Sequence, residues 1–89
     1  MKKTLIVISV LALSISTLFA QTANDYQAKA EQGDAEAQYN LGVCYEKGYG
    51  IDKNEEQAVY WYKKSAEQGY SDAQFCLGEL YYYAKDYKE

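Results

Sequence analysis

The residues best suited to chemistry in this 89-residue chain are two cysteines, a serine beside a lysine, and thirteen carboxylates. Ser65 follows Lys64 directly, so on a helix their side chains point in different directions, and no Ser-x-x-Lys pattern is present. The chain has no histidine, which removes the usual acid–base group near neutral pH and the commonest metal ligand. We therefore expect no catalytic residues, no metal site, no cofactor and no enzymatic activity.

The carboxylates have a structural explanation. Glu55 and Glu56 stand where a helix N-terminus would favour negative charge. The stretch from Asp52 to Glu55 lacks the ligand spacing of a calcium loop. The remaining carboxylates are scattered at the spacing of exposed helix surfaces.

Cys44 and Cys76 leave two alternatives, a disulfide or two small buried thiols. Export would permit a disulfide. On the helices expected below, however, their Cα atoms would lie on the order of 10 Å apart, beyond the ~7 Å that a disulfide can bridge. We favour two thiols.

Residues 1–20 have the layout of a secretory signal peptide. Lys2 and Lys3 give a positive start, an apolar run spans 5–13, and Ala20 precedes Gln21. We predict cleavage after Ala20 and a mature protein that is periplasmic or secreted. The alternative is an uncleaved membrane anchor, but the apolar run is short and interrupted by serines.

Removal of residues 1–20 makes the chain more acidic. Seven lysines would remain against thirteen carboxylates, a net charge of −6, and the chain has no arginine. Such a surface neutralises phosphates poorly, which argues against nucleic acid and anionic membranes as partners. No small-molecule substrate is evident.

The chain repeats itself at an offset of 36 residues. Ten identities fall among the 28 pairs that begin with Tyr26 opposite Tyr62 and end with Lys53 opposite Glu89. Within each unit, apolar residues recur every four positions, as in a helix. We predict helices over 24–32, 35–47, 54–67 and 71–83, each antiparallel to its neighbour. Asn54 with Gln57 is a candidate helix cap, and Ser71 with Gln74 a candidate capping box.

Small residues and large ones alternate on the predicted contact faces. Gly42 and Gly78 stand inside helices, where each costs about 1 kcal/mol relative to alanine. Because the cost recurs at the same point of the repeat, we expect a close helix contact there. The expected packing residues are Ala37, Leu41, Gly42, Tyr45, Ala58, Trp61, Tyr62, Ala66, Ala73, Leu77, Gly78 and Tyr81.

The pattern Ala37-x-x-x-Leu41-Gly42-x-x-Tyr45-x-x-Gly48-x-Gly50-Ile51, followed by Asn54-x-x-x-Ala58-x-x-Trp61-Tyr62-x-x-x-Ala66-x-x-Gly69, resembles a Sel-1-like repeat. That family is related to the tetratricopeptide repeats. The resemblance implies an all-α fold, an α/α solenoid of antiparallel helix pairs in a right-handed superhelix. The domain would span 21–89, with a half repeat at 24–33, a full repeat at 34–69 and an incomplete repeat at 70–89.

The second copy departs from the repeat pattern after Tyr81, where Ala84, Lys85 and Asp86 replace Gly48, Tyr49 and Gly50. Solenoid repeats bury their faces by stacking, so the helix over 71–83 would lack its covering partner. Either a partner or a second copy covers it, or the sequence is truncated. The lack of a polar capping helix favours truncation.

The resemblance also implies that the first helix of each repeat lines a concave, protein-binding groove. The groove residues would be Glu36, Tyr39, Asn40, Val43, Glu46, Asp72, Phe75, Glu79 and Tyr82. Aromatic rings among carboxylates suit a peptide with apolar and basic side chains. Alternatively, Tyr39 and Phe75 belong to the core.

These observations predict an adaptor or scaffold that binds a peptide or protein. A second hypothesis is a self-assembling or truncated structural fragment that associates through its uncapped C-terminal helix. A remote third is a hydrolase of the cysteine-rich repeat type. The disulfide positions of those cysteine-rich proteins are Ala66 and Gln74 here, so their disulfides do not carry over.

Overall fold

The structure is a computed structural model that describes residues 22–88, with side chains placed for 22–83. The chain is helical over 22–31, followed by α2 (Ala35–Lys47), α3 (Glu55–Glu67) and α4 (Ser71–Lys88). No strand occurs in this range, so the predicted all-α solenoid is confirmed. The predicted signal peptide lies outside the described residues. Within them, no helix is long and apolar enough to cross a membrane.

Side chains cap two of the helices. Asp34 Oδ1 accepts from the backbone N–H of Ala37 at 2.8 Å, and Asn54 Oδ1 accepts from that of Gln57 at 3.1 Å. The Asn54 cap was predicted, and the Asp34 cap was missed. The capping box at Ser71 is wrong, because Ser71 is already the first residue of α4.

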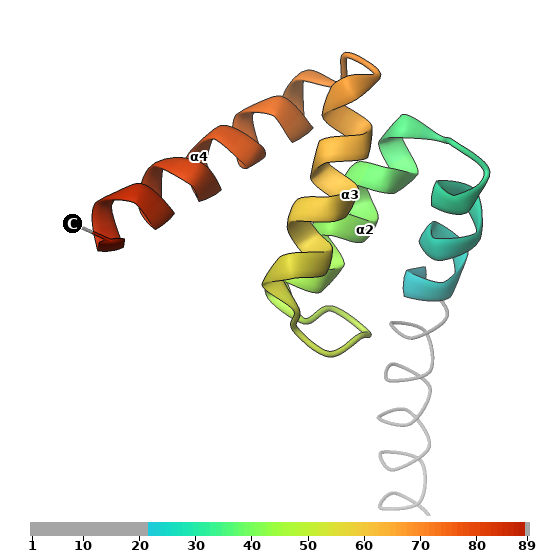
Figure 1. Ribbon diagram of the computed structural model, residues 1–89. Coiled ribbons are helices and arrows are strands. Elements are labelled where there is room, and N and C mark those ends of the chain that lie inside the picture. The colour runs from blue at the N-terminus through green and yellow to red at the C-terminus, as the bar shows by residue number, and fades with distance from the viewer. Residues whose placement is uncertain (1–21, 89) are drawn as a thin grey trace, which may run out of the picture.

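A glycine turn separates α2 from α3. Gly48 adopts the left-handed conformation, with φ of 76°, and its N–H donates to Cys44 O at 2.8 Å. A residue with a Cβ is strained in this conformation. The loop that follows reverses the chain, so α3 packs back along α2, whereas α4 begins beside α3 and leans away from it (Figure 1).

The core is built where α3 crosses α2. Leu41, Tyr62 and Ser65 are fully buried. A Cβ added to Gly42 would lie 2.6 Å from the ring of Tyr62, so the glycine is what lets the ring pack closely against the backbone of α2. The Tyr62 hydroxyl donates to the Glu46 carboxylate. This contact accounts for the glycine that the sequence places inside a helix.

Side-chain amides fasten successive helices with hydrogen bonds that recur at the period of the sequence. Gln38 Nε2 donates to Ala30 O at 3.1 Å, and 36 residues later Gln74 Nε2 donates to Ala66 O at 3.1 Å. Both bonds tie the first helix of a repeat to the last turn of the helix before it. Hydrogen bonds as well as packing contacts therefore recur with the 36-residue period.

The α4 helix buries much less of its surface than α2. Ala73 is fully buried against α3, and Leu77 and Leu80 are half-buried there. Tyr81, however, is 53% exposed, and nothing lies within 4 Å of a Cβ added to Gly78. The helix also continues to Lys88 rather than ending at 83 as predicted.

The two helix glycines provide a matched pair for mutation. We expect Gly42→Ala to destabilise the protein by about 1–3 kcal/mol, because the methyl group would overlap the Tyr62 ring. Gly78→Ala should be neutral or stabilising by up to about 1 kcal/mol, since it gains helix propensity in open space. Urea unfolding followed by circular dichroism measures both. Equal effects would contradict the packing role of Gly42.

Alkaline pH should weaken this core through Tyr62. Burial, and then the Glu46 carboxylate beside the hydroxyl, raise the pKa of Tyr62 well above its usual value near 10. The folded protein therefore favours the neutral phenol. The stability that the neutral Tyr62 side chain contributes is fully present below pH ~10 and is lost progressively as the pH rises above that value. Measured against pH between 9 and 11.5, the free energy of unfolding of Tyr62→Phe should fall less steeply than that of the native protein. Parallel curves would refute this assignment.

Candidate protein-binding surface

The nine predicted groove residues divide between α2 and α4. On α2, Tyr39, Asn40, Val43 and Glu46 are half-buried and Glu36 is exposed; on α4, Asp72, Phe75, Glu79 and Tyr82 are all exposed. The open part of the predicted groove therefore lies mainly on α4.

Tyr39 is largely a packing residue. Its ring centroid lies 5.9 Å from that of Tyr62 and 5.3 Å from that of Tyr70. Burial, and then the neighbouring Cys76, raise the pKa of Tyr39. Of the two alternatives left open for Tyr39 and Phe75, the core position describes Tyr39, whereas Phe75 is 68% exposed.

Two more of the predicted groove residues on α2, Val43 and Glu46, make contacts inside the protein. Val43 packs against the buried cluster of Ala58, Tyr62 and Ala73. The Glu46 carboxylate accepts a hydrogen bond from the Tyr62 hydroxyl, so Glu46 already has a partner within the chain. Asn40 and Glu36 line a separate polar hollow with Tyr26, Lys29, Asp34 and Ala37.

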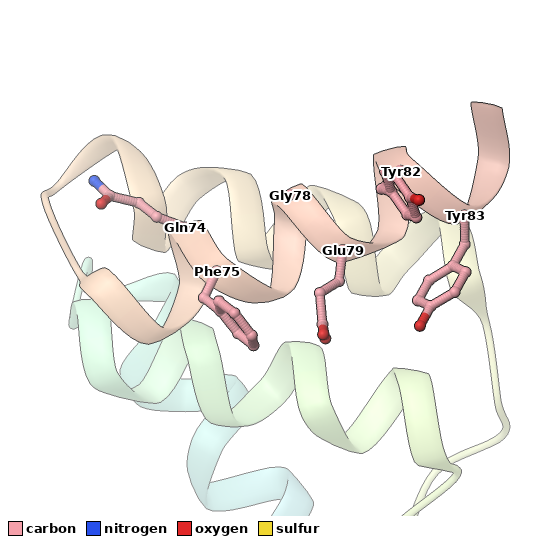
Figure 2. A pocket seen from close by; sticks show the side chains of 6 residues that line it. All are labelled: Gln74, Phe75, Gly78, Glu79, Tyr82 and Tyr83. Carbon is pink, nitrogen blue, oxygen red and sulfur yellow. The ribbon is translucent and has the colours of Figure 1, made fainter. Parts of the chain in front are cut away.

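Three of the four groove residues on α4, namely Phe75, Glu79 and Tyr82, line a shallow hollow of about 450 Å³ (Figure 2). Asp72 lies outside it. Its walls are Gln74, Phe75, Gly78, Glu79, Tyr82 and Tyr83. Phe75, Glu79 and Tyr83 extend from the same side of the helix (Figure 2). Tyr83 was missed as a site residue, although its spacing of four from Glu79 and eight from Phe75 places it on one helical stripe.

The lining of the hollow is mainly aromatic. It offers three aromatic rings, one amide and one carboxylate, and no nucleophile paired with a base. Across the described residues, no group of three potential metal ligands occurs.

Both cysteines are free thiols. Burial raises the pKa of Cys44, and burial followed by the charge of Glu46 raises that of Cys76. Each thiol is therefore held in its protonated, poorly nucleophilic form near neutral pH.

Comparison with known proteins shows which repeat this architecture contains. Residues 35–70 match the family model of the Sel1 repeat. Over 35 residues the chain is 46% identical to DAP3-binding cell death enhancer 1 of Rattus norvegicus and 43% identical to the protein of that name from Mus musculus. These alignments cover 39% of this chain and 7% of each relative.

A solved structure extends the match beyond one repeat. The Sel1 repeat protein from Oxalobacter formigenes superposes with a TM-score of 0.64 and 52% sequence identity, over 65% of this chain and 24% of that one. The chain thus spans a small part of the length of the relatives that it matches. Sel1 repeats generally mediate protein–protein interactions. On the repeat pattern, the fold and these matches, residues 35–70 form a Sel1 repeat.

Proposed function

We propose that this protein is an exported adaptor or scaffold, and that it binds a peptide or protein segment through the hollow on α4. The observation that carries the proposal is the pair of unburied rings on either side of Glu79. Phe75 is 68% exposed and Tyr82 is 64% exposed. Neighbouring exposed aromatic residues on a rigid helix are typical of interaction surfaces, because each buries a large area for little loss of side-chain entropy.

The charge around the hollow indicates the chemistry of the partner. Glu79 lies in the hollow, and Asp72 is exposed on the same helix. The whole chain has a net charge of −4, or −6 without residues 1–20. A segment that combines apolar side chains with lysine or arginine would complement both the rings and the carboxylates.

Export supports a partner in the cell envelope or outside the cell. The proposal rests on the charged start, apolar run and small residue of 1–20. A self-associating role remains the second candidate, favoured by the exposed side of α4. No set of described residues supports the hydrolase alternative.

A pull-down from the envelope fraction tests binding through the hollow. Phe75→Ala/Tyr82→Ala should lose the partners that the native protein retains, while stability changes by less than about 0.5 kcal/mol because both rings are exposed. Tyr49→Ala is the matched control, since Tyr49 is 54% exposed in the loop after α2. Tyr39→Ala is unsuitable, because Tyr39 also packs against Tyr62 and Tyr70. If the double variant keeps every partner, the hollow is not the binding site.

Mass spectrometry tests export. When the full chain is expressed in a bacterium with a periplasm, the protein in the periplasmic fraction should begin at Gln21. A protein retained in the cytoplasm with residues 1–20 intact would contradict the assignment.

A further inference from the structure

A polar hollow lies between the helix over 22–31 and the first turns of α2, apart from the hollow on α4. It has a volume of about 210 Å³ and is lined by Tyr26, Lys29, Asp34, Glu36, Ala37 and Asn40. No described residue of α4 contributes to it. Pockets for drug-sized ligands usually enclose about 300–1,000 Å³, so this hollow has room only for a small group, such as one end of a peptide.

The charged groups of the polar hollow are not paired with one another. Lys29, Asp34 and Glu36 are all exposed. Among the side chains that the structure places, the one ion pair joins Lys47 and Glu46 at 4.0 Å, so the Lys29 ammonium lies farther than 4.0 Å from both carboxylates of the hollow. A ligand can therefore contact both signs of charge without displacing an internal ion pair.

Most hydrogen-bonding groups of the lining are also unused. Asp34 Oδ1 accepts from the backbone N–H of Ala37, which leaves Asp34 Oδ2. No hydrogen bond joins the side chain of Lys29, Glu36 or Asn40 to another described residue. The hollow thus offers carboxylate oxygens as acceptors, and an ammonium group and a side-chain amide as donors.

The equivalent space one repeat later is filled. The counterparts of the six lining residues are Tyr62, Ser65, Tyr70, Asp72, Ala73 and Cys76. Tyr39 packs there, with its ring centroid 5.9 Å from that of Tyr62 and 5.3 Å from that of Tyr70. The polar hollow differs from this filled space at three positions, each of which carries a charge or an amide: Lys29, Asp34 and Asn40.

The carboxylates near the start of α2 make this region electrostatically negative. Burial, and then the charges of Glu36, Asp72 and Asp34, raise the pKa of Tyr70, the residue before α4. Asp34 and Glu36 therefore act together on their surroundings, despite the presence of Lys29. Such a field favours a cationic group in the hollow.

A free peptide N-terminus carries the groups that match this lining. Its ammonium donates three hydrogen bonds and can contact the carboxylates of Asp34 and Glu36, while the carbonyl oxygen beside it can accept from Lys29 and Asn40. The first side chain would then lie against the ring of Tyr26. A lysine side chain has the ammonium but no neighbouring carbonyl, so it would leave both donors of the hollow unpaired.

We propose that the polar hollow binds the free amino terminus of a peptide or protein. The terminal ammonium lies between Asp34 and Glu36, and the first peptide carbonyl accepts hydrogen bonds from Asn40 and Lys29. This contact uses no residue of the hollow on α4, so it is separate from the binding proposed there.

Two dipeptides that differ only at the amine are the probes: alanyl-leucine amide and its N-acetyl derivative. Heteronuclear NMR of the isotope-labelled intact protein should show saturable shifts at the amides of Glu36 and Asn40 with the free amine, with a Kd on the order of 1 mM. The acetylated peptide should bind at least about tenfold more weakly, because it lacks the positive charge.

A charge-neutralising variant tests the site itself. Asp34→Asn/Glu36→Gln should weaken binding of the free amine at least about tenfold. Circular dichroism should show this variant folded, because asparagine caps a helix as well as aspartate does and Glu36 is exposed. Asp52→Asn/Glu56→Gln is the matched control, since it removes two carboxylates outside the hollow and should leave the affinity unchanged.

Four results would overturn the proposal. The first is no saturable shift at peptide concentrations up to about 20 mM. The second is equal affinity for the acetylated peptide, and the third is equal affinity of the Asp34→Asn/Glu36→Gln variant. The fourth is equal affinity for Nα-acetyl-lysine amide, which would assign the hollow to a basic side chain. None of these results would change the outcome of the Phe75→Ala/Tyr82→Ala pull-down.

Discussion

The contact of the Tyr62 ring with the backbone at Gly42 is the constraint on which this small fold depends. It sets how closely α3 approaches α2, and it buries a hydroxyl that then needs Glu46 as acceptor. Helices this short are marginal alone, so most of their stability has to come from packing between them. Gly42 lowers the stability of α2 taken alone, but it permits a close contact that stabilises both α2 and α3.

Much of this architecture could be predicted from the sequence, because the repeat reports packing directly. The recurrence of Gly42 at Gly78 indicated a close helix contact at both positions, which is confirmed at Gly42 and wrong at Gly78. The four helices lie where periodicity placed them. The Asp34 cap was missed, and the box at Ser71 was wrong, because capping depends on local dihedral angles that several polar residues near a turn can satisfy. The length of α4 was underestimated, since nothing in the pattern marks a stop after Tyr83.

The site was harder to predict than the fold. The sequence places the same stripe of residues on the first helix of each repeat. It does not reveal on which of the two helices, α2 or α4, the stripe is covered by a neighbouring helix, and the two helices differ in this respect. Tyr39 and Phe75 occupy equivalent positions of the repeat. Tyr39 nevertheless packs against two other tyrosines, whereas Phe75 is 68% exposed. Exposure depends on the neighbouring helix, which a single stripe cannot report.

The polar outer side of the helix over 22–31 makes the two outer faces of the described helices unequal. Exposed Asp25 and Lys29 favour contact between that helix and water, whereas the exposed rings of Phe75 and Tyr82 make the surface of α4 more apolar. Head-to-tail polymers require two complementary faces on every subunit, a condition that these two faces do not meet.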